Sequence, residues 1–232
     1  MQLIKKFNEI FTKAEIPLKL TPYEILITSS SSGLLEFLVN TNSIDGVKKK
    51  LPKNWNLNKF YRNFFSENFE EAQKNFAESL AAYSLISYIL QIKDRHNGNI
   101  LLDMKGEIIH IDFGFILGIN PGNVNFESAP FKLTKEYCEI LDGMDSDIFQ
   151  YYKSLMLRGL IEVRKYVDVF VKILEVMSKG KYLFILFYFI LFNSPYIFLI
   201  FCFVFLIFIL FYFVYFKELK CLVLKMLKYL LL

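Results

Sequence analysis

Residues 94–115 read DRHNGNILLDMKGEIIHIDFGF and hold the most informative pattern in the chain. Two short apolar runs, ILL and IIHI, are each flanked by a polar loop, and the connection Asp103–Gly106 between them has the composition of a tight turn. We therefore predict a β-hairpin whose strands lie about 5 Å apart. Such a hairpin places Asn99, just before the first strand, beside Asp112, just after the second.

An amide oxygen and a carboxylate in this arrangement suit Mg²⁺, which takes hard oxygen ligands and completes its shell with phosphates and water. Protein kinases place an Asp five residues before a metal-binding Asn, and an Asp-Phe-Gly motif follows. Here Asp94 stands five residues before Asn99, and Asp112-Phe113-Gly114 follows, although His96 comes after the Asp instead of before it. The combination, joined by a hairpin of the right length, is similar to the arrangement with which protein kinases hold Mg²⁺; that similarity implies phosphoryl transfer with ATP and Mg²⁺.

The two loops, residues 94–103 and 109–117, resemble the catalytic and activation loops of the phosphatidylinositol 3- and 4-kinases. Residues 22–27 and 32–38 resemble the strands that lead into the adenine hinge of that family. Three later segments resemble the type III beta phosphatidylinositol 4-kinases in particular: residues 131–136, 143–147 and 151–153. The resemblance covers about residues 1–180 and implies a protein-kinase-like lipid kinase of the α+β class.

Carried over position by position, the resemblance implies a catalytic loop formed by Asp94, Arg95 and His96. Either His96 or Asp94 accepts the proton of the inositol hydroxyl. The reference pKa of histidine favours His96, whereas Asp94 matches the protein-kinase position. Arg95 either ties the loop together or contacts phosphate. Asn99 and Asp112 would hold Mg²⁺.

The resemblance also implies an adenine site. Its hinge would be formed by the backbone of Glu36, Phe37 and Leu38, although Glu36 fits a salt bridge equally well. Its walls would be Tyr23, Ile25, Leu101 and Ile111, and each of these four also fits an ordinary core. His110 is expected to orient the loop and not to react.

Apolar spacing around the hairpin predicts a mixed α+β domain. We expect strands over residues 23–28 and 34–39, and helices over residues 3–14, 67–92, 135–141, 146–158 and 160–177. Thr134 and Ser146 are the expected caps of two of these helices. Residues 40–65 have a mixed pattern, and their basic run Lys48–Lys50 fits either a solvated surface or a membrane contact.

The resemblance divides the chain into three parts. Residues 1–40 would form the end of the N-lobe and the hinge, residues 41–180 the C-lobe with its catalytic and activation loops, and residues 181–232 a hydrophobic tail. The family's phosphate loop and ATP-binding Lys would precede the segment that matches here. We therefore expect a fragment that is inactive as an isolated chain. The alternative is a non-catalytic, membrane-anchored pseudokinase-like binding protein.

Charge and cysteine use exclude several classes of protein. The net charge of +4 belongs to residues 181–232, because residues 1–180 hold 22 basic and 22 acidic side chains. The charge is therefore no argument for a nucleic-acid partner. Three Cys and two His give no zinc ligand set, and the sparse cysteines suit a reducing compartment. The expected partners are ATP and phosphatidylinositol in a membrane surface, and the sequence does not indicate which proteins bind the chain.

The activation loop indicates which lipid is used. No Lys or Arg occurs between Gly114 and Pro130, whereas a loop that grips a polyphosphorylated headgroup should offer several cations. The sequence therefore favours unphosphorylated phosphatidylinositol. Transfer to its 4-hydroxyl is implied by the resemblance alone, as is a peripheral position on cytosolic, Golgi-like membranes.

The tail differs from the rest of the chain. Tyr182–Phe216 is a run of 35 residues without a charge, long enough for one or two transmembrane helices. It contains no Ala, Gly, Thr or Trp, although membrane helices normally use small residues for packing. Two interpretations follow: an integral membrane anchor, or translated non-coding sequence such as a retained intron, which the unusual composition favours.

Overall fold

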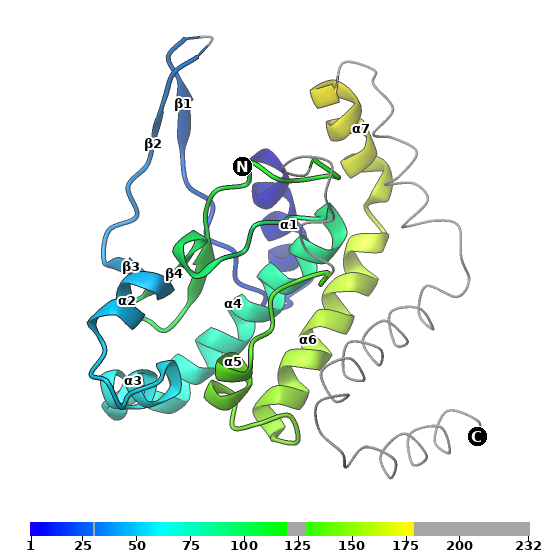
Figure 1. The fold of residues 1–232 in the computed structure, drawn as a ribbon. Coiled ribbons are helices and arrows are strands. Elements are labelled where there is room, and N and C mark those ends of the chain that lie inside the picture. Colours follow the sequence, from blue (N-terminus) through cyan, green and yellow to red (C-terminus); the bar gives the residue numbers. More distant parts are fainter. Residues whose placement is uncertain (30, 120–128, 179–232) are drawn as a thin grey trace, which may run out of the picture. The chain divides into compact units, whose positions relative to one another are not determined.

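The computed structural model describes residues 1–29, 31–119 and 129–178, which form the mixed α+β arrangement that the sequence predicts. Helix α1 (Gln2–Lys13) matches its predicted position and buries the apolar face that its spacing indicated. The predicted strands form an antiparallel hairpin, β1 (Ile25–Ile27) and β2 (Gly33–Leu35), that is shorter than expected. Figure 1 shows this hairpin extending away from the helices, and all its side chains are exposed. Every side chain of the two strands is exposed, so burial contributes little to the stability of this hairpin.

The predicted central hairpin is present as β4 (Ile100–Asp103) and β5 (Ile108–His110). A further strand, β3 (Thr41–Ser43), pairs antiparallel with β4, so that the sheet has the order β3-β4-β5. Gly106 in the hairpin turn has a φ of +86°, which favours glycine. A side chain there would also collide with the Tyr61 hydroxyl, whose one proton is shared between Ala72 O at 2.7 Å and Gly106 O at 2.9 Å.

The stretch with a mixed sequence pattern, residues 40–65, contains two short helices, α2 (Ile44–Lys50) and α3 (Leu57–Phe64). The 3₁₀ turn η1 (Ser66–Asn68) follows it. Ser43 caps α2 by accepting a hydrogen bond from Gly46 N at 3.0 Å, and Asn56 caps α3 in the same way. Each of these α-helices buries only two side chains, so its apolar period is too brief to recognise in the sequence.

The core is built on α4 (Phe69–Leu90), the long helix predicted over residues 67–92, whose buried side chains lie on nearly all its sides. It packs against α6 (Asp147–Arg164), which runs beside it in Figure 1. Gly159 of α6 lies against Leu18 and Leu85, where a side chain would collide with both. This glycine therefore permits the close approach of the two helices.

Helices α5 (Lys135–Ile140) and α6 begin directly after the two residues predicted to cap them. Thr134 caps α5 and Ser146 caps α6. Helix α6 continues to Arg164, beyond the predicted end at residue 158, and the break falls at residues 165–166 before α7 (Val167–Ser178). The 3₁₀ turn η2 (Asn97–Asn99) leads directly into β4.

Within the part of the chain that the structure describes, no helix combines the length and the apolarity needed to cross a bilayer. The tail, residues 181–232, lies outside the described residues, and so do residues 120–128 of the activation loop. Both interpretations of the tail therefore remain predictions.

Candidate active site

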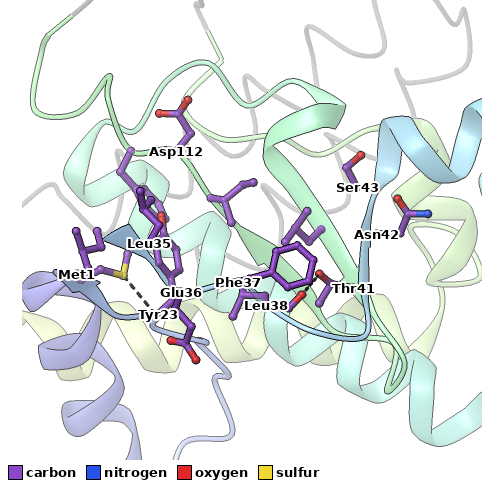
Figure 2. Close-up of a pocket in the computed structure, with 14 residues that line it drawn as sticks. Met1, Tyr23, Leu35, Glu36, Phe37, Leu38, Thr41, Asn42, Ser43 and Asp112 are labelled. Atoms are coloured by element: carbon purple, nitrogen blue, oxygen red, sulfur yellow. Dashed lines mark hydrogen bonds between the residues drawn. The ribbon is translucent and has the colours of Figure 1, made fainter. Parts of the chain in front are cut away.

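A cavity of about 740 Å³ lies between the hinge segment, residues 36–38, and the ends of β4 and β5. Its lining includes every residue that the sequence analysis assigned to the adenine site: Tyr23, Ile25, Glu36, Phe37, Leu38, Leu101 and Ile111. In Figure 2 the hinge residues follow one side of the cavity and Asp112 lies across from them. Segments far apart in sequence thus converge on one mostly apolar cavity of a size typical for cofactors.

Tyr23 joins the wall of the cavity to the second polar loop. Its side chain is buried, and its backbone N–H points to the Met1 sulfur at 3.5 Å. Burial raises the pKa of the Tyr23 phenol, and the negative charge of Asp112 adds to this, while a hydrogen bond with the Asp112 backbone and the charge of Arg95 act against it. The phenol therefore stays neutral and stabilises the backbone at Asp112.

The hinge segment is held at both ends by hydrogen bonds. Glu36 N donates to Glu24 O at 2.9 Å, and the Glu36 carboxylate accepts from Glu24 N at 2.8 Å. The carboxylate thus binds a backbone amide, and no cation of the described residues pairs with it. Farther along, Leu38 O accepts from the Thr41 hydroxyl at 2.8 Å. Between these anchors Phe37 is 83% exposed, so the segment runs along the surface of the molecule.

In the first polar loop, Asp94 and His96 lie next to each other. Asp94 has a φ of +59°, a left-handed conformation that Asp tolerates better than most residues. His96 Nδ1 accepts a hydrogen bond from Gly98 N at 3.0 Å. His96 Nε2 lies 3.9 Å from an Asp94 carboxylate oxygen. Because a backbone N–H can only donate, a neutral His96 carries its proton on Nε2, on the side of Asp94.

Arg95 is almost completely buried and joins the two polar loops. Its guanidinium donates to Lys93 O at 3.0 Å, to Ile111 O at 2.8 Å and to Asp112 O. It also lies 5.5 Å from the ring centre of Phe113. These bonds satisfy three backbone carbonyls and hold the first polar loop against Ile111 and Asp112.

Lys132, at the end of the activation loop, binds the same region. Its ammonium group donates to Arg95 O and to the Asn97 side chain, both at 2.8 Å. At the beginning of that loop, Leu117 N donates to Leu90 O at 2.8 Å. The described ends of the activation loop are therefore both fastened next to the first polar loop.

Asn99 and Asp112 lie at the open end of the hairpin, as predicted. Ile111 N donates to Asn99 O at 3.0 Å, which continues the β4–β5 pairing by one step and brings the next residue, Asp112, to the same end. The Asn99 amide nitrogen donates to Asp94 O at 3.0 Å, so its oxygen is the atom available to a ligand. Asp112 has a φ of +56° and an exposed side chain, with one carboxylate oxygen accepting from Gly114 N at 3.1 Å.

These two oxygen donors form a partial site. Among the residues with described positions, no group of three or more His, Cys, Asp or Glu side chains could hold a metal ion by itself. One carboxylate and one amide oxygen fit Mg²⁺ when substrate phosphates supply further ligands, which is how that ion is commonly bound.

His110 does not line the cavity. It is buried on β5 and stacks on Tyr83 of α4, with the ring centres 4.5 Å apart. Burial lowers the pKa of His110 well below its ordinary value, and the positive charges of Arg95 and Lys132 lower it further. The imidazole is therefore neutral and packs the hairpin against α4.

Sequence reasoning missed the polar edge of the cavity. Thr41, Asn42 and Ser43 of β3 line it, together with Met1, Leu35 and Phe113. One signal was present: Ser43 stands immediately before the apolar pair Ile44 and Val47, the position of a helix cap. The strand itself has three residues, too few for its alternation to be recognised.

Comparison with known proteins agrees with this geometry. Residues 1–184 match the family model described as phosphatidylinositol 3- and 4-kinase. The chain is 50% identical over 184 residues to a phosphatidylinositol 4-kinase of Dictyostelium discoideum, with 78% of this chain and 16% of that protein covered. It is 48% identical to phosphatidylinositol 4-kinase beta of Danio rerio over 186 residues, and to phosphatidylinositol 4-kinase beta 2 of Arabidopsis thaliana over 189 residues. These alignments cover 78% of this chain and 22% and 17% of the two relatives, respectively.

The matched region includes both polar loops, the hairpin between them and the whole lining of the cavity. The chain spans about a fifth of the length of these relatives. The motifs, the cavity and the extent of the match lead to one conclusion: this chain belongs to the phosphatidylinositol 3- and 4-kinase family.

Proposed function

We propose that the chain is the catalytic part of a phosphatidylinositol 4-kinase, which transfers the γ-phosphate of ATP to the 4-hydroxyl of phosphatidylinositol at a cytosolic membrane surface. The observation that carries this proposal is the convergence of all seven expected adenine-site residues on one cavity that also includes Asp112. Relatives that are 48–50% identical and named phosphatidylinositol 4-kinases support the choice of reaction. In this proposal residues 1–40 are the end of the N-lobe with the hinge, and residues 41–180 are the C-lobe.

Asn99 and Asp112 would hold Mg²⁺ through the amide oxygen and the carboxylate. The metal, when bound, neutralises charge on the phosphates of ATP. The chain's own contribution is to hold these two oxygens in place. The Asn99 amide is oriented by its bond to Asp94 O, and the Asp112 backbone is fixed by Arg95.

Asp94 is the better candidate for the base that receives the proton of the inositol hydroxyl. The hydrogen bond from Gly98 N occupies the lone pair on His96 Nδ1, and Nε2 then carries a proton. The Asp94 carboxylate, in contrast, has lone pairs to offer. His96, which general pKa values favoured, would instead orient the Asp94 carboxylate from a distance of 3.9 Å. Of the two roles left open for Arg95, its bonds to three carbonyls support tying the loops together.

The choice of lipid follows from charge. The activation loop has no Lys or Arg between Gly114 and Pro130, and the first cation after it, Lys132, is bonded to Arg95 O and Asn97. The loop therefore offers little to the extra phosphates of a polyphosphorylated headgroup, and plain phosphatidylinositol is the proposed substrate.

The test is a lipid kinase assay of the full-length protein with ATP, Mg²⁺ and either phosphatidylinositol or its 4,5-bisphosphate. We expect phosphatidylinositol 4-phosphate as the product and little turnover of the bisphosphate. Asp112→Asn should lower kcat by at least about 100-fold, because it removes the charge that binds the metal. Binding of ATP without phosphorylation of any lipid would support the pseudokinase alternative. Near-normal turnover by Asp112→Asn would overturn the metal assignment.

A further inference from the structure

The segment from the end of α2 through α3 is strongly basic. Residues 46–66 contain six Lys and Arg and no Asp or Glu, although residues 1–180 as a whole are neutral. Three of the six cations are neutralised by acids outside the segment: Lys48 by Glu136, Lys49 by Asp45 and Arg62 by Asp142. The proposed kinase chemistry uses none of these six residues.

The other three cations, Lys50, Lys53 and Lys59, are exposed. Over residues 1–29, 31–119 and 129–178, no carboxylate lies within ion-pair distance of their ammonium groups. Trp55 lies among them in the sequence, half-buried, and the Lys59 ammonium is 5.1 Å from the centre of its ring. The turn is held by a hydrogen bond from Trp55 N to Pro52 O at 2.9 Å. We call Lys50, Lys53, Trp55 and Lys59 the α2–α3 basic surface.

This surface is attached to the elements around the first polar loop. Helix α2 packs against η2, which contains Asn99. Glu136 of α5, the helix that follows the activation loop, accepts hydrogen bonds from Lys48 and from Leu57 N at 3.4 Å. The α2–α3 basic surface is therefore attached to η2, which leads into β4, and to α5, which follows the activation loop in the chain.

We propose that the α2–α3 basic surface binds an anionic lipid bilayer and places the proposed catalytic loop against the membrane. Lysines attract anionic headgroups, and tryptophan prefers the boundary between headgroups and acyl chains. Phe64 of α3, 47% exposed, adds an apolar side chain nearby. A nucleic acid is a poorer match, because a nucleic-acid-binding domain is usually basic overall and residues 1–180 carry no net charge. The catalytic part of this inference rests on the proposed function, but the binding part does not.

Trp55 provides a direct probe, since it is the only tryptophan among the 232 residues. The 232-residue chain is mixed with vesicles of phosphatidylcholine, with or without 20% phosphatidylserine, and with brominated phosphatidylcholine as quencher. With phosphatidylserine we expect a blue shift of Trp55 emission, quenching by the brominated lipid, and loss of both effects at high salt. Sedimentation of the protein with these vesicles while Trp55 emission stays unchanged would overturn the inference, because binding would then occur elsewhere.

A charge-reversal variant tests the lysines. Lys50→Glu/Lys53→Glu/Lys59→Glu should lower the partition coefficient for anionic vesicles by roughly 100-fold, since each lysine contributes about a factor of five. The matched control, Lys13→Glu/Arg158→Glu/Lys172→Glu, changes the net charge equally at exposed positions of α1, α6 and α7. In Figure 1, α6 and α7 lie on the other side of α4 from α2 and α3. Equal weakening by the two variants would overturn the proposal.

A kinase assay separates this inference from the proposed function. On phosphatidylinositol in neutral detergent micelles, the Lys50/Lys53/Lys59 variant should match the unmodified protein, whereas on anionic vesicles it should be slower by at least about 10-fold. If the protein phosphorylates no lipid but its Trp55 is quenched by vesicles, the proposed function is refuted and the proposed membrane-binding surface is supported. If the variant has normal activity on anionic vesicles, membrane binding by the α2–α3 basic surface is refuted and the proposed kinase function is supported.

Discussion

The hairpin segment, residues 94–115, which holds the proposed catalytic residues, and the helical core of α4 and α6 are stabilised in different ways. In the hairpin and its loops, a single buried guanidinium, that of Arg95, holds three backbone carbonyls, and both Asp94 and Asp112 have left-handed backbones. Of the side chains with proposed chemical roles, Asp94 is half-buried, His96 and Asp112 are exposed, and Asn99 is buried. In the helical core, apolar side chains from nearly all sides of α4 are buried, and Gly159 lets α6 approach closely.

This contrast indicates that the residues proposed for the chemistry and the residues that stabilise the fold are different ones. Left-handed non-glycine residues cost free energy and often occur at functional sites, where the surrounding structure holds them in place. Core side chains contribute through the apolar area that they bury. Substitutions of exposed loop carboxylates should therefore reduce activity with little change in stability, and substitutions in the core should do the opposite.

The largest expected effect is on the rate of phosphoryl transfer. Asp94→Asn keeps the shape of the side chain and tolerates the left-handed backbone, but it removes the proposed base. We expect kcat to fall roughly 1,000-fold and the melting temperature to stay within about 2 °C. Initial rates on phosphatidylinositol in micelles and thermal unfolding of the full-length protein measure the two quantities.

His96→Asn is the matched comparison for this prediction. His96 is the N-cap residue of η2, and asparagine can still accept the hydrogen bond from Gly98 N in that position. Because His96 is proposed to orient Asp94 and not to take the proton, its loss should lower kcat only about 10-fold. A larger loss in His96→Asn than in Asp94→Asn would reverse the assignment of the base.

The second prediction concerns the helical core. Leu85 is completely buried on α4 and lies against Gly159 of α6. Leu85→Ala should lower the free energy of unfolding by about 3 kcal/mol through lost burial and a cavity. Turnover per folded molecule should remain near normal at low temperature. The control is Ile161→Ala, at a position of α6 that is 52% exposed, which should change stability by less than about 0.5 kcal/mol. A strong loss of activity without loss of stability in Leu85→Ala would contradict this separation of roles between loop and core residues.

The two regions also differ in how far the sequence predicts them. The hairpin segment was predicted by a motif, because a turn between two apolar runs fixes which residues meet at its open end. The long helix α4 was predicted by its composition, and the starts of α5 and α6 by their caps. These features are local, so their determinants lie next to each other in the chain.

The features that were missed depend on distant partners. Strand β3 forms because β4 offers an edge to Thr41–Ser43, and three residues carry no pattern of their own. Helix α6 continues past residue 158 because Gly159, a weak helix former, fits tightly against Leu18 and Leu85. The His96 tautomer depends on a bond from Gly98 N that spacing alone does not reveal.

The smallest expected effect concerns a residue that connects the two regions. His110 belongs to the hairpin but stacks on Tyr83 of α4, and the charges facing it are those of Arg95 and Lys132. Its pKa is lowered well below the ordinary value, first by burial and then by these two cations. The unfolded chain therefore binds a proton at His110 below about pH 6.5, whereas the folded chain does not. The stability due to the neutral imidazole is present above that pH and is lost as the pH falls.

Between pH 7.5 and pH 5.0 this difference should remove about 2 kcal/mol from the free energy of unfolding. His110→Phe keeps a flat ring against Tyr83 and cannot titrate, so its unfolding free energy should fall by about 2 kcal/mol less over the same range. Urea unfolding of both proteins at the two pH values measures this, and other titrating groups cancel in the comparison. Equal pH dependence in the two proteins would mean that His110 is protonated in the folded state. The hairpin would then meet the helical core through a charged contact, and the separation between the two regions would be weaker than their packing indicates.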